Sequence, residues 1–117
     1  MNFIKIDPQN RTVSIVESDG SNESFCRLIG AQFLDVCARQ DNHDALLMDD
    51  DALDSDPQPQ AFEFDGFGPL HGIAIVTGCN WDGETTEPAF TVEQVVERII
   101  WLGSIHTKPT LEWIGWK

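Results

Sequence analysis

The sequence is 117 residues long and 41% apolar, and twenty acidic against seven basic residues give it a formal net charge of −13. This length predicts a single domain, residues 1–117, with one continuous core. The few basic residues are dispersed, which argues against direct binding to nucleic acid or anionic lipid, because phosphate neutralisation requires clustered Lys and Arg.

The first thirty residues predict a hairpin followed by a short helix. Residues 3–6 and 12–16 are β-branched, apolar-rich runs separated by a turn that contains Pro and Asn. Ser21 can cap a helix of about three turns, in which apolar residues recur at i, i+3 and i+4. Gly30 is placed to end this helix.

The middle of the chain predicts four further strands. Residues 32–38 and 45–48 form a second expected hairpin, joined by the polar run 40–43. Residues 61–64 show the alternating side-chain pattern of a short strand. Residues 71–77 are the most continuous β-branched run, which predicts a central strand covered on both faces.

The longest predicted helix spans residues 91–102. Thr91 and Gln94 form a capping box, and Gly103 ends the run. Its buried stripe is predicted to consist of Val92, Val95, Val96, Ile99, Ile100 and Leu102.

These elements predict an α+β fold: a small antiparallel sheet of five or six strands, with the short helix and the longer amphipathic helix packed on it. Residues 49–60 and 78–90 are predicted loops, the segments in which function is most often found. Residues 104–117 form a Trp-rich tail. Trp113 and Trp116 there either cover one end of the core or provide a surface for homodimer formation.

No catalytic or metal-binding motif is visible. Cys26, Cys37 and Cys79 are far apart, with no C-x-x-C pair, which favours reduced thiols in a cytoplasmic protein. No signal peptide or long apolar segment is present. No nucleophile elbow or phosphate-binding glycine loop is found either, so we expect a protein without cofactors that is not an enzyme.

The strongest charge pattern is an acidic segment, residues 40–97, which contains fourteen Asp or Glu residues and no Lys or Arg. Its densest part lacks the spacing of an EF-hand, which disfavours a calcium site. Two interpretations stay open: a solvated surface that only aids solubility, and a surface that binds a basic protein. The carboxylates expected to bind such a partner are Asp49, Asp50, Asp51, Asp54 and Asp56.

A second candidate contact lies in the loop 78–90. Trp81 is followed there by Asp82 and Glu84, and an exposed indole flanked by acids is typical of a binding surface. The alternative is that Trp81 folds back onto the core.

The order of features from residue 3 to 102 resembles a family of uncharacterised small proteins carried by phages and plasmids. The similarity is carried by Ile29-Gly30, by 46–48, by 72–78, by 82–84 and by the helix start 91–95. It implies a protein of a mobile genetic element. With that association, the acidic segment favours a protein that blocks a basic, nucleic-acid-handling host protein through its carboxylates. The alternative is a small-molecule binder, or an enzyme acting on a small ligand, with a pocket near His71 and Trp81.

Overall fold

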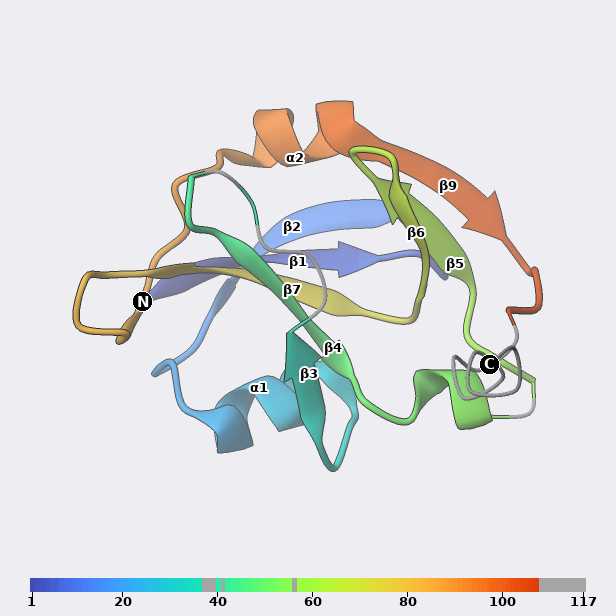
Figure 1. Ribbon diagram of the computed structural model, residues 1–117, viewed down its shortest axis with the longest axis horizontal. Coiled ribbons are helices and arrows are strands. Elements are labelled where there is room, and N and C mark those ends of the chain that lie inside the picture. The colour runs from blue at the N-terminus through green and yellow to red at the C-terminus, as the bar shows by residue number, and fades with distance from the viewer. Residues whose placement is uncertain (37–39, 41, 56, 108–117) are drawn as a thin grey trace, which may run out of the picture.

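The computed structural model describes residues 1–36, 40, 42–55 and 57–107. These residues form strands, two α-helices and one 3-10 turn (Figure 1). In chain order the elements are β1 (Asn2–Asp7), β2 (Thr12–Glu17), α1 (Asn22–Ile29), β3 (Leu34–Val36), β4 (Ala45–Asp49), η1 (Ala52–Asp54), β5 (Ala61–Phe64), β6 (Phe67–His71), β7 (Ala74–Cys79), β8 (Thr85–Thr86), α2 (Val92–Arg98) and β9 (Ile99–Gly103).

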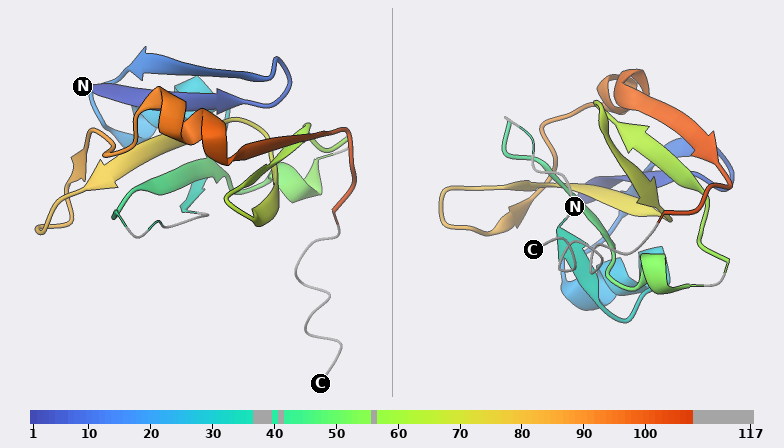
Figure 2. Two further views of the ribbon diagram at one scale, coloured as in Figure 1. Left: turned by 90° about the horizontal axis from the view of Figure 1, so that it is seen from above. Right: turned by 45° about the vertical axis from the view of Figure 1, so that its right-hand side comes forward.

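The strands form two antiparallel sheets. The larger has the order β2-β1-β7-β4-β3, with β8 paired to the end of β7, and the smaller has the order β6-β5-β9. The smaller sheet and α2 lie on one side of the larger sheet, and α1 lies on the other (Figure 2). The predicted antiparallel sheet of five or six strands with two helices is confirmed. The predicted α+β class fits only roughly, because strands predominate and the helices are short, and the second sheet was not predicted.

β7 is the central strand, as predicted, because it pairs with β1 on one side and β4 on the other. Its side chains alternate between two cores. Ile75 packs with Phe3 and Phe25 beneath α1, whereas Ala74 and Val76 belong to the larger cluster between the two sheets. All of these β7 side chains are fully buried. The strand begins at Ala74 rather than at residue 71.

The expected features of α1 are confirmed. The Ser21 hydroxyl accepts a hydrogen bond from the Ser24 N–H, and Gly30 adopts the left-handed conformation with φ of 81°. Hydrogen bonds from the hydroxyl and backbone N–H of Ser21 lower the pKa of Asp19, just before the helix. A few neighbouring residues therefore define both ends of α1.

The prediction of a helix over 91–102 is wrong in its second half. The Thr91–Gln94 capping box forms, but α2 ends at Arg98 and the chain is extended at Ile99, with φ of −96° and ψ of 136°. From there β9 pairs with β5, which places Ile99 opposite Phe64 and Trp101 opposite Phe62. β-branched and aromatic residues favour this pleated pairing once a partner strand is available.

The predicted helical stripe is wrong for the same reason. Val95 is fully buried, but Val96 is 52% exposed and Ile100 is 57% exposed. The two turns of helix present Val95 and the partly buried Val92 to the core. The remaining burial from this part of the chain comes through β9, where Ile99 and Trp101 pack against the larger cluster.

The predicted loops contain more structure than expected. Residues 49–60 include η1, and residues 78–90 include the end of β7 and all of β8. β6 was also missed. It forms a hairpin with β5 around Asp65-Gly66, where both residues have positive φ, of 52° and 80°. An Asp-Gly pair is typical of such turns, so the sequence did contain this signal.

The adjacent valines of α2 provide a matched test. Val95→Ala should lower the free energy of unfolding by about 1–3 kcal/mol, because it removes buried methyl groups and leaves a cavity. Val96→Ala should change it by less than about 0.5 kcal/mol, as is usual for an exposed site. Urea unfolding followed by circular dichroism measures both. Equal losses of unfolding free energy in the two variants would contradict this difference in burial and favour the longer helical stripe.

Candidate binding surface

The structure divides the predicted partner-binding residues into two groups. Asp49, Asp50, Asp51 and Asp54 lie at the end of β4 and in η1, whereas Trp81, Asp82 and Glu84 lie in the turn between β7 and β8. β4 and β7 are antiparallel, with Ala45 opposite Thr77, so the end of β4 lies beside the start of β7. At about 3.3 Å per residue, the eight residues of strand between the level of Asp49 and Trp81 place the two groups roughly 25 Å apart. Asp56 lies outside the described residues.

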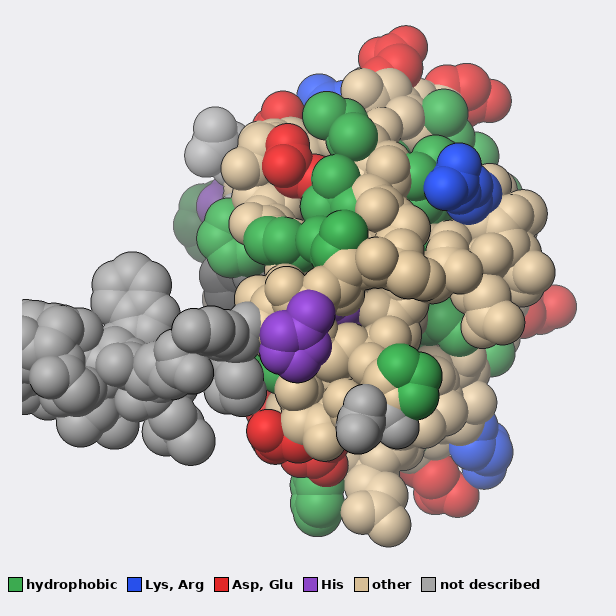
Figure 3. All heavy atoms as spheres, turned by 90° about the vertical axis from the view of Figure 1, so that its right-hand side faces the viewer, with side chains coloured by type: hydrophobic (Ala, Val, Ile, Leu, Met, Phe, Trp, Pro, Cys, Tyr) green, Lys and Arg blue, Asp and Glu red, His purple; other side chains and the backbone are tan. Residues whose placement is uncertain are grey.

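The acidic loop after β4 is an ordered turn. The Asp49 carboxylate accepts the Asp51 N–H at 2.9 Å, and the Asp54 N–H donates to the Asp51 carbonyl at 3.1 Å. Over the described part of the chain, no three His, Cys, Asp or Glu side chains are grouped so as to hold a metal ion. Acidic side chains on the face at this end of the molecule form separate groups rather than one continuous patch (Figure 3).

The β7–β8 turn is held by a single asparagine. The Asn80 side-chain carbonyl accepts the N–H groups of Asp82 at 3.0 Å and Glu84 at 2.9 Å. Its side-chain NH₂ donates to the Glu84 carboxylate at 3.3 Å, and backbone hydrogen bonds join Asn80 to Glu84 and Gly83. None of these hydrogen bonds involves the side chain of Trp81. The indole is therefore not needed to form the turn.

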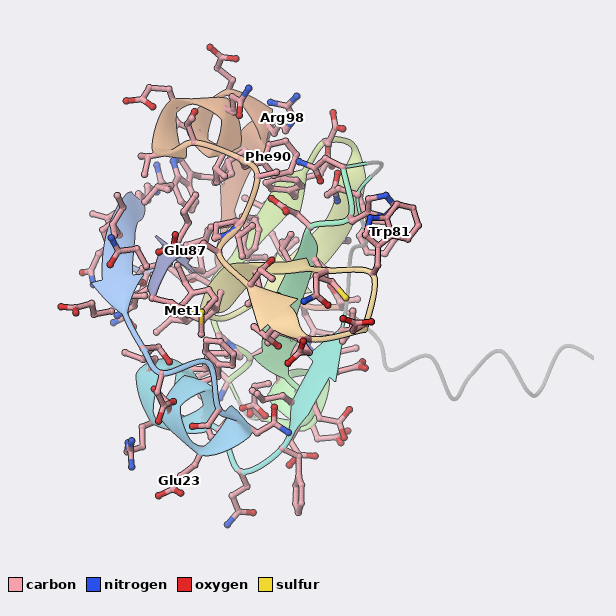
Figure 4. All side chains as sticks on the ribbon, turned by 90° about the vertical axis from the view of Figure 1, so that its left-hand side faces the viewer. Met1, Glu23, Trp81, Glu87, Phe90 and Arg98 are labelled. Atoms are coloured by element: carbon pink, nitrogen blue, oxygen red, sulfur yellow. The ribbon has the colours of Figure 1, made fainter. Side chains whose placement is uncertain are left out.

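Trp81 is 100% exposed at this turn, which decides between the two interpretations left open by the sequence. Figure 4 shows it projecting from the edge of the molecule. The His43 ring lies beside it, with centroids 6.3 Å apart and planes inclined by 50°. A hollow of about 180 Å³ is lined by His43, Cys79, Asn80 and Trp81, and we call it the notch.

His43 is held in place by the buried carboxylate that follows it. Asp44 is 1% exposed and accepts the N–H groups of Ala89 and Phe90, each at 2.9 Å. The Asp44 N–H donates to the side chain of Asn42, and His43 has a positive φ of 73°. Sequence reasoning missed this role of Asp44, because an acid in a polar turn gives no sign that a segment 45 residues later will contact it.

His71 belongs to a different part of the molecule. It is 3% exposed; in the neutral ring Nδ1 donates to the Pro59 carbonyl at 2.7 Å and Nε2 accepts from the Thr107 hydroxyl at 2.8 Å. The side chain of Gln58 also holds Thr107, by accepting its N–H and donating to its carbonyl. Trp81 lies at the other end of β7, so among the described residues His71 and Trp81 line separate hollows.

Neither helix of the described chain is long and apolar enough to cross a membrane. A scan against protein-family models finds no match, and comparisons with curated proteins and with solved structures find none either. The resemblance to phage- and plasmid-borne proteins therefore stays a prediction. The proposed dimer surface at Trp113 and Trp116 lies outside the described residues.

We expect the Asp44 carboxylate to be essential for stability. Asp44→Ala removes the charged acceptor of two part-buried N–H groups, and a hydrogen bond to a charged group contributes about 1.5–3 kcal/mol. The expected loss of unfolding free energy is therefore about 3–6 kcal/mol. Asp50→Ala is the matched control, because Asp50 is exposed and should change stability by less than about 0.5 kcal/mol. Similar urea midpoints for the two variants would contradict this role.

Proposed function

We propose that the chain is an acidic, non-enzymatic binding protein that contacts a basic protein partner through the β7–β8 turn. The observation that carries the proposal is the fully exposed Trp81 on a turn built without its side chain. Asp82 and Glu84 follow it in the same turn. The proposal includes the cytoplasmic location expected from the cysteines.

An indole in this position favours a contact function. Tryptophan buries a large apolar area when a partner covers it, and it is enriched among the residues that dominate interface energies. Trp81 contributes nothing to either core cluster and supports none of the turn's hydrogen bonds. A fixed turn also lowers the entropy lost on association.

The charge of the chain supports a basic partner. Its net charge is −13, and the 58 residues from 40 to 97 contain no Lys or Arg. Between described residues the one ion pair is Arg27–Glu23, at 3.1 Å on exposed α1, so most carboxylates are not neutralised by a basic side chain. Such a field accelerates encounter with positively charged surfaces.

The partner class we propose is a nucleic-acid-handling protein. Surfaces that bind phosphates present clustered Lys and Arg, which are the groups that this acidic chain attracts. Occupying such a surface would block it, in line with the mobile-element role that the sequence resemblance implies. The small-molecule alternative is not supported, because His71 uses both ring nitrogens within the fold and lies away from Trp81.

Affinity capture with matched baits tests the proposal. The wild-type bait should retain a basic protein from a bacterial lysate, and the Trp81→Ser bait should not retain that protein. A duplex DNA oligonucleotide should displace the captured protein from the wild-type bait. Trp81→Ser should fold normally, since the side chain is fully exposed. The proposal fails if both baits retain the same proteins, or if DNA does not compete.

Binding kinetics should distinguish the role of the acidic loop after β4 from the role of the β7–β8 turn. Changing Asp49, Asp50, Asp51, Asp54 and Asp56 together to Asn should slow association and reduce its salt dependence, because charges away from the contact act mainly by steering. The dissociation rate should change little. Trp81→Ala should instead accelerate dissociation, as loss of a central contact does. Biosensor measurements at several salt concentrations give both rates, and the reverse pattern would place the contact at the acidic loop.

A further inference from the structure

We infer that the notch is a receptor for one arginine side chain of the partner. This inference rests on the proposed function and specifies its central contact. The walls of the notch are His43, Cys79, Asn80 and Trp81, which come from the turn before β4 and from the β7–β8 turn.

The size of the notch fits a side-chain head group. Its volume of about 180 Å³ is below the roughly 300–1,000 Å³ typical of pockets for complete small ligands. Among its described lining residues, His43 and Trp81 have aromatic rings, whose planes diverge by 50°. A planar guanidinium can stack on the face of an indole, whereas a compact, strongly hydrated ammonium fits such a surface less well.

The charge of the notch favours a cation. The Glu84 carboxylate is held against one wall by the Asn80 side chain, at 3.3 Å, and Asp82 directly follows Trp81. These carboxylates disfavour phosphate or carboxylate ligands and can pair with a guanidinium that lies on the indole.

The basic residue that follows Trp81 along the sequence is engaged elsewhere. Arg98 lies over the Phe90 ring at 4.7 Å and donates to the Gln94 carbonyl at 2.8 Å. Figure 4 shows Arg98 beside Phe90 near α2 and apart from Trp81. Arg98 therefore does not occupy the notch, and Arg39, four residues before His43, lies outside the described residues.

Both walls of the notch are formed before any ligand arrives. The Asn80 hydrogen bonds hold the β7–β8 turn, and the Asp44 carboxylate anchors the residue next to His43. A preformed site loses little conformational entropy on binding. A single arginine can therefore be measured in isolation, without the rest of the partner.

A peptide titration tests the inference directly. The probe is a short Gly/Ser peptide with one arginine, and the matched control replaces the arginine by citrulline, its neutral isostere. In ¹H–¹⁵N spectra of the full-length protein, the arginine peptide should shift the indole N–H of Trp81 and the amides of His43 and Asn80. The citrulline peptide should not. A lysine peptide should bind more weakly.

Variants identify the groups responsible. Trp81→Ala should weaken arginine-peptide binding roughly 2- to 30-fold, the range that corresponds to a cation–π contact. The double variant Asp82→Asn/Glu84→Gln keeps the turn's hydrogen-bonding atoms, removes two charges and should also weaken binding. Glu23→Gln removes a charge on α1, where Figure 4 shows Glu23 apart from Trp81, and should leave the affinity within about 2-fold, because salt screens exposed charges beyond about 10 Å.

The outcomes separate this inference from the proposed function. Shifts confined to Asp49–Asp54 would overturn the arginine site but leave an acidic binding protein. Equal binding of the citrulline or lysine peptide would also overturn the assignment of arginine. If neither the arginine peptide nor a basic protein binds anywhere on the chain, both proposals fail together.

Discussion

The buried carboxylate of Asp44 is the interaction on which the fold and the candidate site both depend. It accepts two backbone N–H groups from Ala89 and Phe90, just before α2, and so attaches that segment to the start of β4. α2 leads directly into β9, which pairs with β5 in the smaller sheet. The same carboxylate fixes the turn that carries His43. Without these hydrogen bonds, the layer over the larger sheet and one wall of the notch would lose a shared anchor.

The candidate surface combines a rigid turn with charge distributed elsewhere. Asn80 organises the β7–β8 turn, so that Trp81 can be completely exposed without loss of local order. The acidic loop after β4 lies at the other end of the β4–β7 pair, because the two strands are antiparallel. In the function that we propose, the turn provides the specific contact and the carboxylates of the loop act over distance by electrostatic steering.

The differences between expectation and structure have identifiable physical causes. Residues 91–102 satisfy a helical pattern, but Ile99 to Trp101 pair with β5, because β-branched and aromatic side chains gain more by packing in a sheet there. The partner strand is about 35 residues earlier in the sequence, so helical periodicity alone could not reveal it. The β5–β6 hairpin was different: Asp65-Gly66 is a local turn signal that the sequence analysis did not use.

The sequence by itself determined the features that depend on neighbouring residues or on simple totals. These include the caps of α1 and α2, the central position of β7 and the acidic charge. Helix caps depend on contacts within three or four residues, and the net charge depends only on the number of charged residues and not on their positions in the fold. Only the tertiary structure decided that Trp81 is exposed beside His43, that Asp44 is buried and that the acidic loop lies far from the turn. Each of these depends on strand register and on contacts between distant segments, which a local pattern does not specify.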